Sequence, residues 1–275
     1  SYKVTEKDAE KAGYTWTVEV NGETGSETTV AVPDKGTAEA KYTNTYEEFE
    51  GIIIGLKGTK KLEGRVLTAG EFQFEVSRKS GEAANVTLPS ETITNTADGK
   101  ISISGIGFKK AGTYVLTVKE KAGNDEGIEY SNASYDVTVV VKNGEKSLEI
   151  ESVKAGETVL QKNAEGAYEL PNESGKDASF VNRVKKGSLT ITKTVAAPDG
   201  TEMKTGEYIF KVTRDGKEYA QDGSQADGAV IEVKAGETVT VSSLPIGSYK
   251  VTEVDAEKAG YTWTVEVNGE TGSET

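Results

Sequence analysis

The stretch Tyr114-Val-Leu-Thr-Val-Lys-Glu120 has an apolar side chain at every second position from Tyr114 to Val118. This period of two predicts a β-strand with one buried face. The face that carries Leu116 and Val118 also carries Glu120. The pattern therefore indicates the fold class, and it places an ionisable side chain where a core residue is expected.

The same alternation recurs along the chain. It is found in Phe72-Gln-Phe-Glu-Val76, Tyr135-Asp-Val-Thr-Val139, Leu189-Thr-Ile-Thr-Lys193 and Tyr249-Lys-Val-Thr-Glu253. Turn pairs such as Asp199-Gly200 and Asp215-Gly216 separate these runs, and no helical alternation is present. We therefore expect an all-β chain of tandem Ig-like β-sandwiches arranged as a linear rod.

The chain contains a long internal repeat. Residues Ser1–Thr28 recur as Ser248–Thr275, with Lys7 replaced by Val254 as the single difference, at a period of 247 residues (248 − 1). Such near-identity indicates a tandem array. Together with pauses in the strand pattern near Glu50 and Lys185, it predicts three parts. They are 1–48, the end of a preceding domain; 49–185, a complete sandwich; and 186–275, the start of a domain completed by the next repeat or chain.

The composition excludes several classes of function. The chain of 275 residues has 32 Lys and Arg against 45 Asp and Glu, a net charge of −13, and neither His nor Cys. The negative charge argues against nucleic acid and anionic membranes as partners. Thiol and imidazole chemistry, disulfides and ordinary zinc sites are excluded, so no cofactor or metal is expected. No apolar run is long enough to enter a membrane. Without an initiator Met or a signal peptide, we expect an internal fragment or a mature product.

Two further polar side chains lie on apolar strand faces in the central part. Lys60 shares its face with Leu56 and Leu62, and Asn182 shares the face of Phe180. A second set in the same order of first strand, penultimate region and last strand consists of Lys193, Glu253 and Asn44.

Burying Lys and Glu singly is costly, so they must be neutralised, paired or reacted. A desolvated lysine becomes a neutral nucleophile, and a desolvated glutamic acid can shuttle protons. Beside both, an asparagine amide can lose ammonia and form a Lys–Asn isopeptide bond. The ordinary alternative is that each lysine snorkels from a strand end and each asparagine caps a turn. For one residue alone that alternative is favoured, but two complete sets favour the cross-link.

The central part resembles a known family. Its motifs Lys60-Lys-Leu-Glu-Gly-Arg65, Ala69-Gly-Glu-Phe-Gln-Phe74, Ala111–Glu120, Gly127-Ile-Glu-Tyr130 and Phe180-Val-Asn182 resemble a Gram-positive major-pilin domain of the intramolecular isopeptide type. The resemblance implies a bond between Lys60 and Asn182, catalysed by Glu120. Lys61 is the alternative to Lys60, because neighbouring lysines leave the register open.

The last part resembles the collagen-adhesin B-type (Cna B-type) domain. The matching motifs are Gly187-Ser-Leu-Thr-Ile-Thr-Lys193, Tyr208-Ile-Phe210, Leu244–Glu253 and Ala259-Gly-Tyr261, with Tyr42-Thr-Asn44-Thr-Tyr46 as the last strand. This resemblance implies a bond between Lys193 and an Asn44 equivalent, catalysed by Glu253 or by its copy Glu6. Lys193 has no such asparagine downstream in this sequence, so we expect its partner in the next repeat or another molecule.

The two resemblances and the tandem repeat together imply a structural repeat of a bacterial surface stalk or pilus-like fibre, extracellular and attached to the cell wall, that presents a distal adhesin. The expected partners are neighbouring repeats or chains joined head to tail, and a host ligand at the tip. We expect no enzyme, because no nucleophile–base pair, metal set or phosphate loop is present. The alternative is an adhesin module that recognises host matrix protein or glycan through Tyr14, Trp16, Tyr261 and Trp263.

Overall fold

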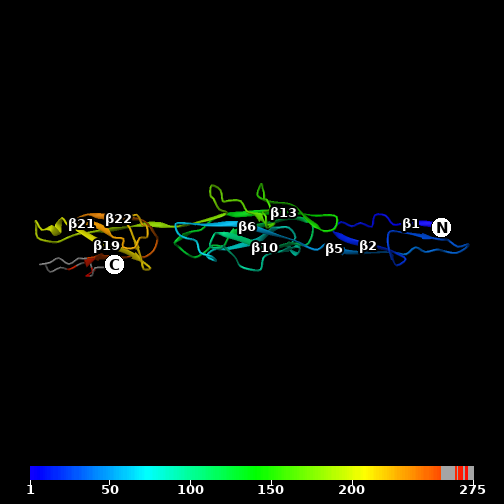
Figure 1. The fold of residues 1–275 in the computed structure, drawn as a ribbon, viewed down its shortest axis with the longest axis horizontal. Coiled ribbons are helices and arrows are strands. Elements are labelled where there is room, and N and C mark those ends of the chain that lie inside the picture. The colour runs from blue at the N-terminus through cyan, green and yellow to red at the C-terminus, as the bar shows by residue number, and fades with distance from the viewer. Residues whose placement is uncertain (255–263, 265, 269, 272–275) are drawn as a thin grey trace. The chain divides into compact units, whose positions relative to one another are not determined.

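The computed structural model describes residues 1–254, 264, 266–268 and 270–271 (Figure 1). Within these residues the secondary structure is strand, apart from two short 3-10 helices, η1 (Ala83–Asn85) and η2 (Glu202–Lys204). The all-β prediction is therefore confirmed. The turn at Asp215-Gly216 shows why the sequence pattern was informative. Both residues have a positive φ, which is the conformation that a two-residue hairpin turn requires.

The central part contains two sheets. The first has the order β17-β6-β10-β8, with β16 also paired to β6. Its strands are β6 (Ile52–Glu63), β8 (Val86–Thr87), β10 (Lys100–Phe108), β16 (Tyr168–Glu169) and β17 (Phe180–Val184). The second has the order β15-β14-β13-β11-β7-β9. Its strands are β7 (Gln73–Ser80), β9 (Ile93–Thr94), β11 (Gly112–Glu120), β13 (Ser134–Asn143), β14 (Leu148–Ala155) and β15 (Thr158–Val159). The short strand β12 (Ile128–Glu129) pairs with the last two residues of β17.

Aromatic side chains connect the two central sheets. The rings of Phe108 on β10 and Tyr114 on β11 are 4.8 Å apart, and those of Phe74 on β7 and Phe180 on β17 are 5.0 Å apart. These spacings are typical of packed aromatic pairs. The two sheets therefore form a sandwich with one apolar core between them.

Residues 1–48 form two small sheets, with the orders β1-β4 and β3-β2-β5. The strands are β1 (Tyr2–Thr5), β2 (Tyr14–Val20), β3 (Glu23–Thr24), β4 (Glu27–Val30) and β5 (Tyr42–Glu48). Two hydrogen bonds connect the sheets or their loops: the Tyr42 hydroxyl donates to the carbonyl of Val4 at 2.9 Å, and the Tyr46 hydroxyl donates to that of Ala9 at 2.8 Å.

The last part also has two main sheets, β18-β22 and β20-β19-β21, with β23 paired to β19. The strands are β18 (Lys186–Thr192), β19 (Glu207–Arg214), β20 (Lys217–Tyr219), β21 (Ile231–Lys234), β22 (Thr238–Pro245) and β23 (Lys250–Val254), followed by the hairpin β24 (Glu266–Val267) and β25 (Glu270–Thr271). Their core contains Phe210, Val212, Ile231, Val233 and Val241.

The two copies of the repeat can be compared strand by strand. Glu19 pairs with Thr24, and the equivalent Glu266 pairs with Thr271, so this hairpin has the same register in both copies. The strand that precedes it differs in its partner: β1 pairs with β4, whereas its copy β23 pairs with β19. The same sequence therefore pairs with a different strand in each copy. This is possible because a β-strand can form hydrogen bonds along either of its two edges.

By contacts the chain divides into two compact units, Ser1–Gly123 with Tyr130–Asn182, and Asn124–Glu129 with Arg183–Thr275. Among the described strands, none before residue 49 shares a sheet with a later one. The three-part division at 48 and 185 remains a prediction. No described helix is long and apolar enough to cross a membrane. Within the described residues, no three acidic side chains lie close enough to hold a metal ion.

Candidate cross-link sites

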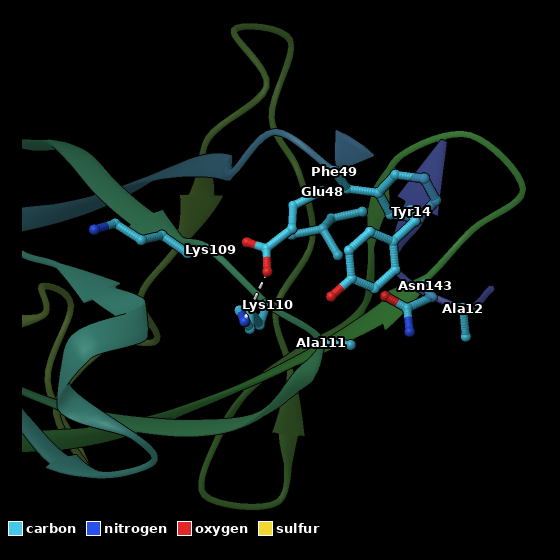
Figure 2. Close-up of a pocket in the computed structure, with 10 residues that line it drawn as sticks. Ala12, Tyr14, Glu48, Phe49, Lys109, Lys110, Ala111 and Asn143 are labelled. Atoms are coloured by element: carbon cyan, nitrogen blue, oxygen red, sulfur yellow. Dashed lines mark hydrogen bonds and ion pairs between the residues drawn. The ribbon is translucent and has the colours of Figure 1, made fainter. Parts of the chain in front are cut away.

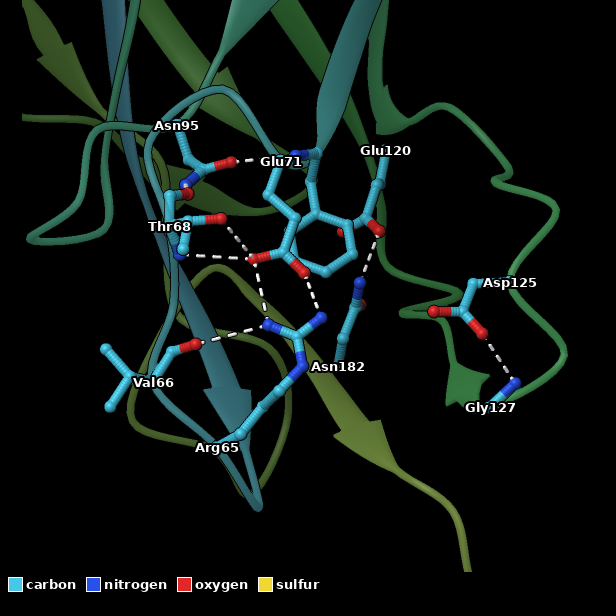
Figure 3. Close-up of polar contacts among 10 residues, drawn as sticks. Arg65, Val66, Thr68, Glu71, Asn95, Glu120, Asp125, Gly127 and Asn182 are labelled. Carbon is cyan, nitrogen blue, oxygen red and sulfur yellow. Dashed lines mark hydrogen bonds and ion pairs between the residues drawn. The ribbon is translucent and has the colours of Figure 1, made fainter. Parts of the chain in front are cut away.

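The central sandwich brings Lys60, Glu120 and Asn182 together. Nζ of Lys60 donates to Oε2 of Glu120 at 2.7 Å, and Nδ2 of Asn182 donates to Oε1 of the same carboxyl group at 2.6 Å. Figure 3 shows the contact between Glu120 and Asn182. The Lys60 and Glu120 side chains are 0% and 1% exposed, and Asn182 is fully buried. An amine, a carboxyl group and an amide thus meet in a buried site.

The strand pattern explains why these three residues converge. On β6, Lys60 is buried between Gly58 and Leu62 on the inner face, and on β11 Glu120 follows Leu116 and Val118 on the same face. Neighbouring strands β6 and β17 bring Lys60 and Asn182 into one sheet. A tight turn supports this placement. The amide of Lys60 donates to Gly99 at 2.6 Å, and a Cβ at Gly99, whose φ is +81°, would lie 2.2 Å from the Lys60 carbonyl.

The surroundings of Lys60 favour its neutral form. Burial lowers the pKa of Lys60, against the opposing effect of the Glu120 carboxyl group. The Phe72 ring covers the amine, with Nζ 4.5 Å from the ring centre. The side-chain oxygen of Asn95 holds the backbone of this residue by accepting a hydrogen bond from the Phe72 amide at 2.9 Å. The sequence identified Phe72 only as part of a strand, because its contact with Lys60 requires the tertiary fold.

The two neighbouring lysines have different surroundings. Lys60 is buried in the site, whereas Lys61 is exposed and its Nζ lies 2.6 Å from Oδ2 of Asp177. Of the two, only Lys60 has the buried environment that the proposed chemistry requires.

A change at Glu120 tests its role as a proton carrier. We expect Glu120→Gln to slow the loss of ammonia strongly, by about 10²- to 10⁴-fold, because an amide does not take a proton from the attacking amine and pass it on. Intact mass measured over time after synthesis reports the rate. Formation of the bond at the wild-type rate would contradict the proton-carrier role.

The last part of the chain holds a lysine–glutamate pair of similar geometry. Nζ of Lys193 lies 2.8 and 3.0 Å from the two carboxyl oxygens of Glu253, with the side chains 15% and 3% exposed. The Tyr208 ring covers this lysine at 4.4 Å, as Phe72 covers Lys60. Burial raises the pKa of Tyr208, and the nearby Glu253 adds to the effect.

Residues 1–48 contain the complementary pair. Nδ2 of Asn44 donates to Oε1 of Glu6 at 2.6 Å, between β5 and the segment after β1. The other two oxygens, Oε2 of Glu6 and Oδ1 of Asn44, are buried and have no hydrogen-bond partner among the residues that the structure describes. An unsatisfied buried carboxyl oxygen is costly, and an amine would satisfy it.

Two family models match the chain, one over its central part and one over its last part. Residues 56–185 match the family model described as the Spy0128-like isopeptide-containing domain, and residues 187–275 match a domain family of unknown function. The first match confirms the predicted resemblance of the central part of the chain to an isopeptide-containing domain of the pilin type. The Cna B-type assignment of the following residues remains a prediction.

A search of solved structures also finds matches. The major pilin of Streptococcus pyogenes matches with 19% identity over 76% of this chain and 83% of that chain, with a TM-score of 0.42. The T3.2 major pilin of the same species has 20% identity, 82% and 90% coverage and a TM-score of 0.42. The TIE protein of Bacillus anthracis has 19% identity, 98% and 47% coverage and a TM-score of 0.35. No curated protein sequence matches the chain.

Proposed function

We propose that this chain is a structural repeat of a bacterial surface stalk or pilus-like fibre, and that Lys–Asn isopeptide bonds stabilise it. The observation that carries the proposal is the buried group of Lys60, Glu120 and Asn182, linked through one carboxyl group at 2.7 and 2.6 Å. Placement outside the cell on the cell wall, and partners that are neighbouring repeats, belong to the same proposal. The chain acts as a mechanical element rather than an enzyme, because each site would react once and keep its product.

The chemistry follows from the positions of the atoms. The neutral amine of Lys60 adds to Cγ of Asn182, forming the new C–N bond. Glu120 takes one proton from the attacking nitrogen at Oε2 and supplies one to Nδ2 from Oε1. The C–Nδ2 bond breaks and ammonia leaves, so Glu120 ends as it began and the chain is lighter by about 17 Da.

The position of the bond suits a load-bearing element. β6 is the first strand of the central sandwich and β17 is its last, and the two are neighbours in one sheet. A covalent tie between them carries tension directly from one strand to the other, so the hydrogen-bonded sheet is not pulled apart. The chain has no cysteine, so this bond takes the role that a disulfide has in other extracellular proteins.

The partial sites at the two ends support completion across repeats. Among the described residues, no asparagine is hydrogen-bonded to the pair of Lys193 and Glu253, and no lysine is hydrogen-bonded to the pair of Glu6 and Asn44. The strand edges agree: β18 is at the end of the order β18-β22, and β5 is at the end of β3-β2-β5. Joining β18 to β5 would extend both sheets and bring a lysine to the unsatisfied oxygens of Glu6 and Asn44. We propose that this joining occurs between consecutive repeats or chains.

Neighbouring lysines provide a matched test of the central bond. We expect Lys60→Ala to restore the full unmodified mass of the central domain, because it removes the nucleophile. Lys61→Ala removes an equal side chain from an exposed ion pair with Asp177, and it should keep the loss of about 17 Da. Intact mass and a cross-linked peptide from a protease digest provide the measurement. If wild type and Lys60→Ala showed the same mass deficit, the assignment of the lysine would be wrong. A wild type of unmodified mass would contradict the proposed cross-link and, with it, the proposed function.

A ligand-binding module is the second candidate, and one pocket favours it. Figure 2 shows this pocket, which Tyr14, Phe49 and Asn143 help to line, with Glu48 and Lys110 paired at 3.2 Å. Tyr14 and Trp16, however, lie on the face of β2 that ends in buried Val20, and Tyr14 packs against Tyr46. Their place favours packing over a recognition platform. Tyr261 and Trp263 lie outside the described residues. Binding to host matrix proteins or glycans that Tyr14→Ala abolishes would favour this alternative.

A further inference from the structure

A contact on the far side of Asn182 determines which way its amide points. The backbone N–H of Ser131 donates to Oδ1 of Asn182 at 2.7 Å. A backbone amide can only donate, so it must face the oxygen and not the NH₂ group. Nδ2 is thereby directed at the carboxyl group of Glu120. The nitrogen that would leave as ammonia faces the proton carrier, and the oxygen that would gain charge faces a donor.

We propose that the backbone N–H of Ser131 is the oxyanion donor of the cross-linking reaction, and that Glu173 is the positioning residue that holds it in place. This inference rests on the proposed cross-link. It adds the group that stabilises the reacting oxygen, a role that Lys60 and Glu120 do not fill.

The contacts around Ser131 keep this donor fixed. Ser131 lies in the segment between β12 and β13, and its hydroxyl donates to Oε2 of Glu173 at 2.9 Å. The same oxygen accepts from the amide of Val181 at 3.1 Å, one residue before Asn182. Glu173 thus ties the Ser131 segment to β17 beside the reacting amide. Because Asn182 is 0% exposed, water cannot replace the donor.

The electrostatics favour the tetrahedral intermediate over the starting amide. When Nζ of Lys60 adds to Cγ of Asn182, the C=O double bond becomes single and negative charge develops on Oδ1. A hydrogen bond to an ionised oxygen is stronger than one to a neutral carbonyl, and the difference is greatest in a site without water. The oxygen regains its double bond when the C–Nδ2 bond breaks, and the Ser131 contact can pass unchanged to the product.

The main test compares two substitutions at one position. Ser131→Pro removes the N–H, whereas Ser131→Ala keeps it and removes only the hydroxyl group. The chain is synthesised in a cell-free system, samples are quenched in acid at intervals, and their intact mass is measured by mass spectrometry. We expect Ser131→Pro to lose ammonia about 10²- to 10³-fold more slowly than wild type, as when one oxyanion donor is removed, and Ser131→Ala to slow less than tenfold. Equal rates for Ser131→Pro and wild type would overturn the proposal.

The same assay tests Glu173. Glu173→Gln keeps an oxygen acceptor for the Ser131 hydroxyl and the Val181 amide, so it should react nearly as fast as wild type. Glu173→Ala removes the acceptor and should react more slowly than Glu173→Gln. If Glu173 acts mainly by holding the Ser131 N–H, as proposed, combining Glu173→Ala with Ser131→Pro should slow the reaction little further than Ser131→Pro alone. Independent, multiplying effects would contradict the positioning role.

Two controls separate chemistry from folding. In a Glu120→Ala background, in which we expect no bond to form, Ser131→Pro should leave the melting temperature within a few degrees. If the proline variant does not fold, hydrogen exchange of the Ser131 amide is measured in Glu120→Ala instead. We expect this amide to be protected at least about 10²-fold. Exchange at the rate of an unstructured peptide would overturn the proposal. A wild type that never loses ammonia would instead contradict the proposed cross-link itself. Failure of the Ser131 proposal and failure of the proposed function can therefore be distinguished.

Discussion

Replacing Asn182 by alanine should lower the stability of the central domain by roughly 5 kcal/mol. Without the amide no bond forms, and the 122 residues from Lys60 to Asn182 (182 − 60) are no longer closed into a loop in the unfolded chain. For a domain of this size, we expect the melting temperature to fall by about 15 to 20 °C. Calorimetry of wild type and Asn182→Ala, each with its intact mass, provides the measurement.

Asn95→Ala is the matched control for this change. Asn95 is also buried, and the hydrogen bonds of its side chain join it to the Phe72 amide and to the carbonyls of Thr68 and Thr96. We expect it to cost about 1 to 3 kcal/mol, because buried partners are left unsatisfied, and to keep the mass deficit. If Asn182→Ala melted within a few degrees of wild type while wild type carried the deficit, the bond would not be the main source of stability.

Concentrated wild-type chain should form covalent oligomers, joined between Lys193 of one molecule and Asn44 of another. The strand β1 of the acceptor has the same sequence from Tyr2 to Thr5 as residues 249–252 of the donor, which include most of β23. Exchange of one for the other therefore costs little in packing, and β18 gains β5 as a neighbour. We expect a ladder on a denaturing gel, each step adding one chain and removing a further 17 Da or so.

Two single variants make this test specific. Asn44→Ala keeps the donor Lys193, and Lys193→Ala keeps the acceptor Asn44, so neither should form oligomers alone. Their mixture should give a dimer and no longer species. A monomer that loses a second ammonia through a bond between its own Lys193 and Asn44 would overturn the arrangement across repeats. If concentrated wild type formed no covalent oligomer, the proposed joining between separate chains would be wrong.

Much of the fold could be predicted from the sequence, because period two is a local property of the chain. The alternation on 114–118 and 189–193 identified strands, and the side chains on each face, from neighbours two residues apart. The repeat at 247 residues likewise identified the copied hairpin, whose register is the same at Glu19 and Glu266.

The sequence by itself determined which side chains lie on the inner faces: Lys60, Glu120 and Asn182 follow from strand periodicity alone. Only the tertiary structure brought them together, because their contact depends on pairing between strands whose residues Lys60 and Asn182 are 122 positions apart (182 − 60). It separated Lys60 from Lys61 by burial, and it brought Phe72 over the amine. It also revealed Ser131, whose contribution is a backbone N–H that every residue except proline carries. No sequence pattern can mark such a donor, because its role comes from position and not from side-chain type.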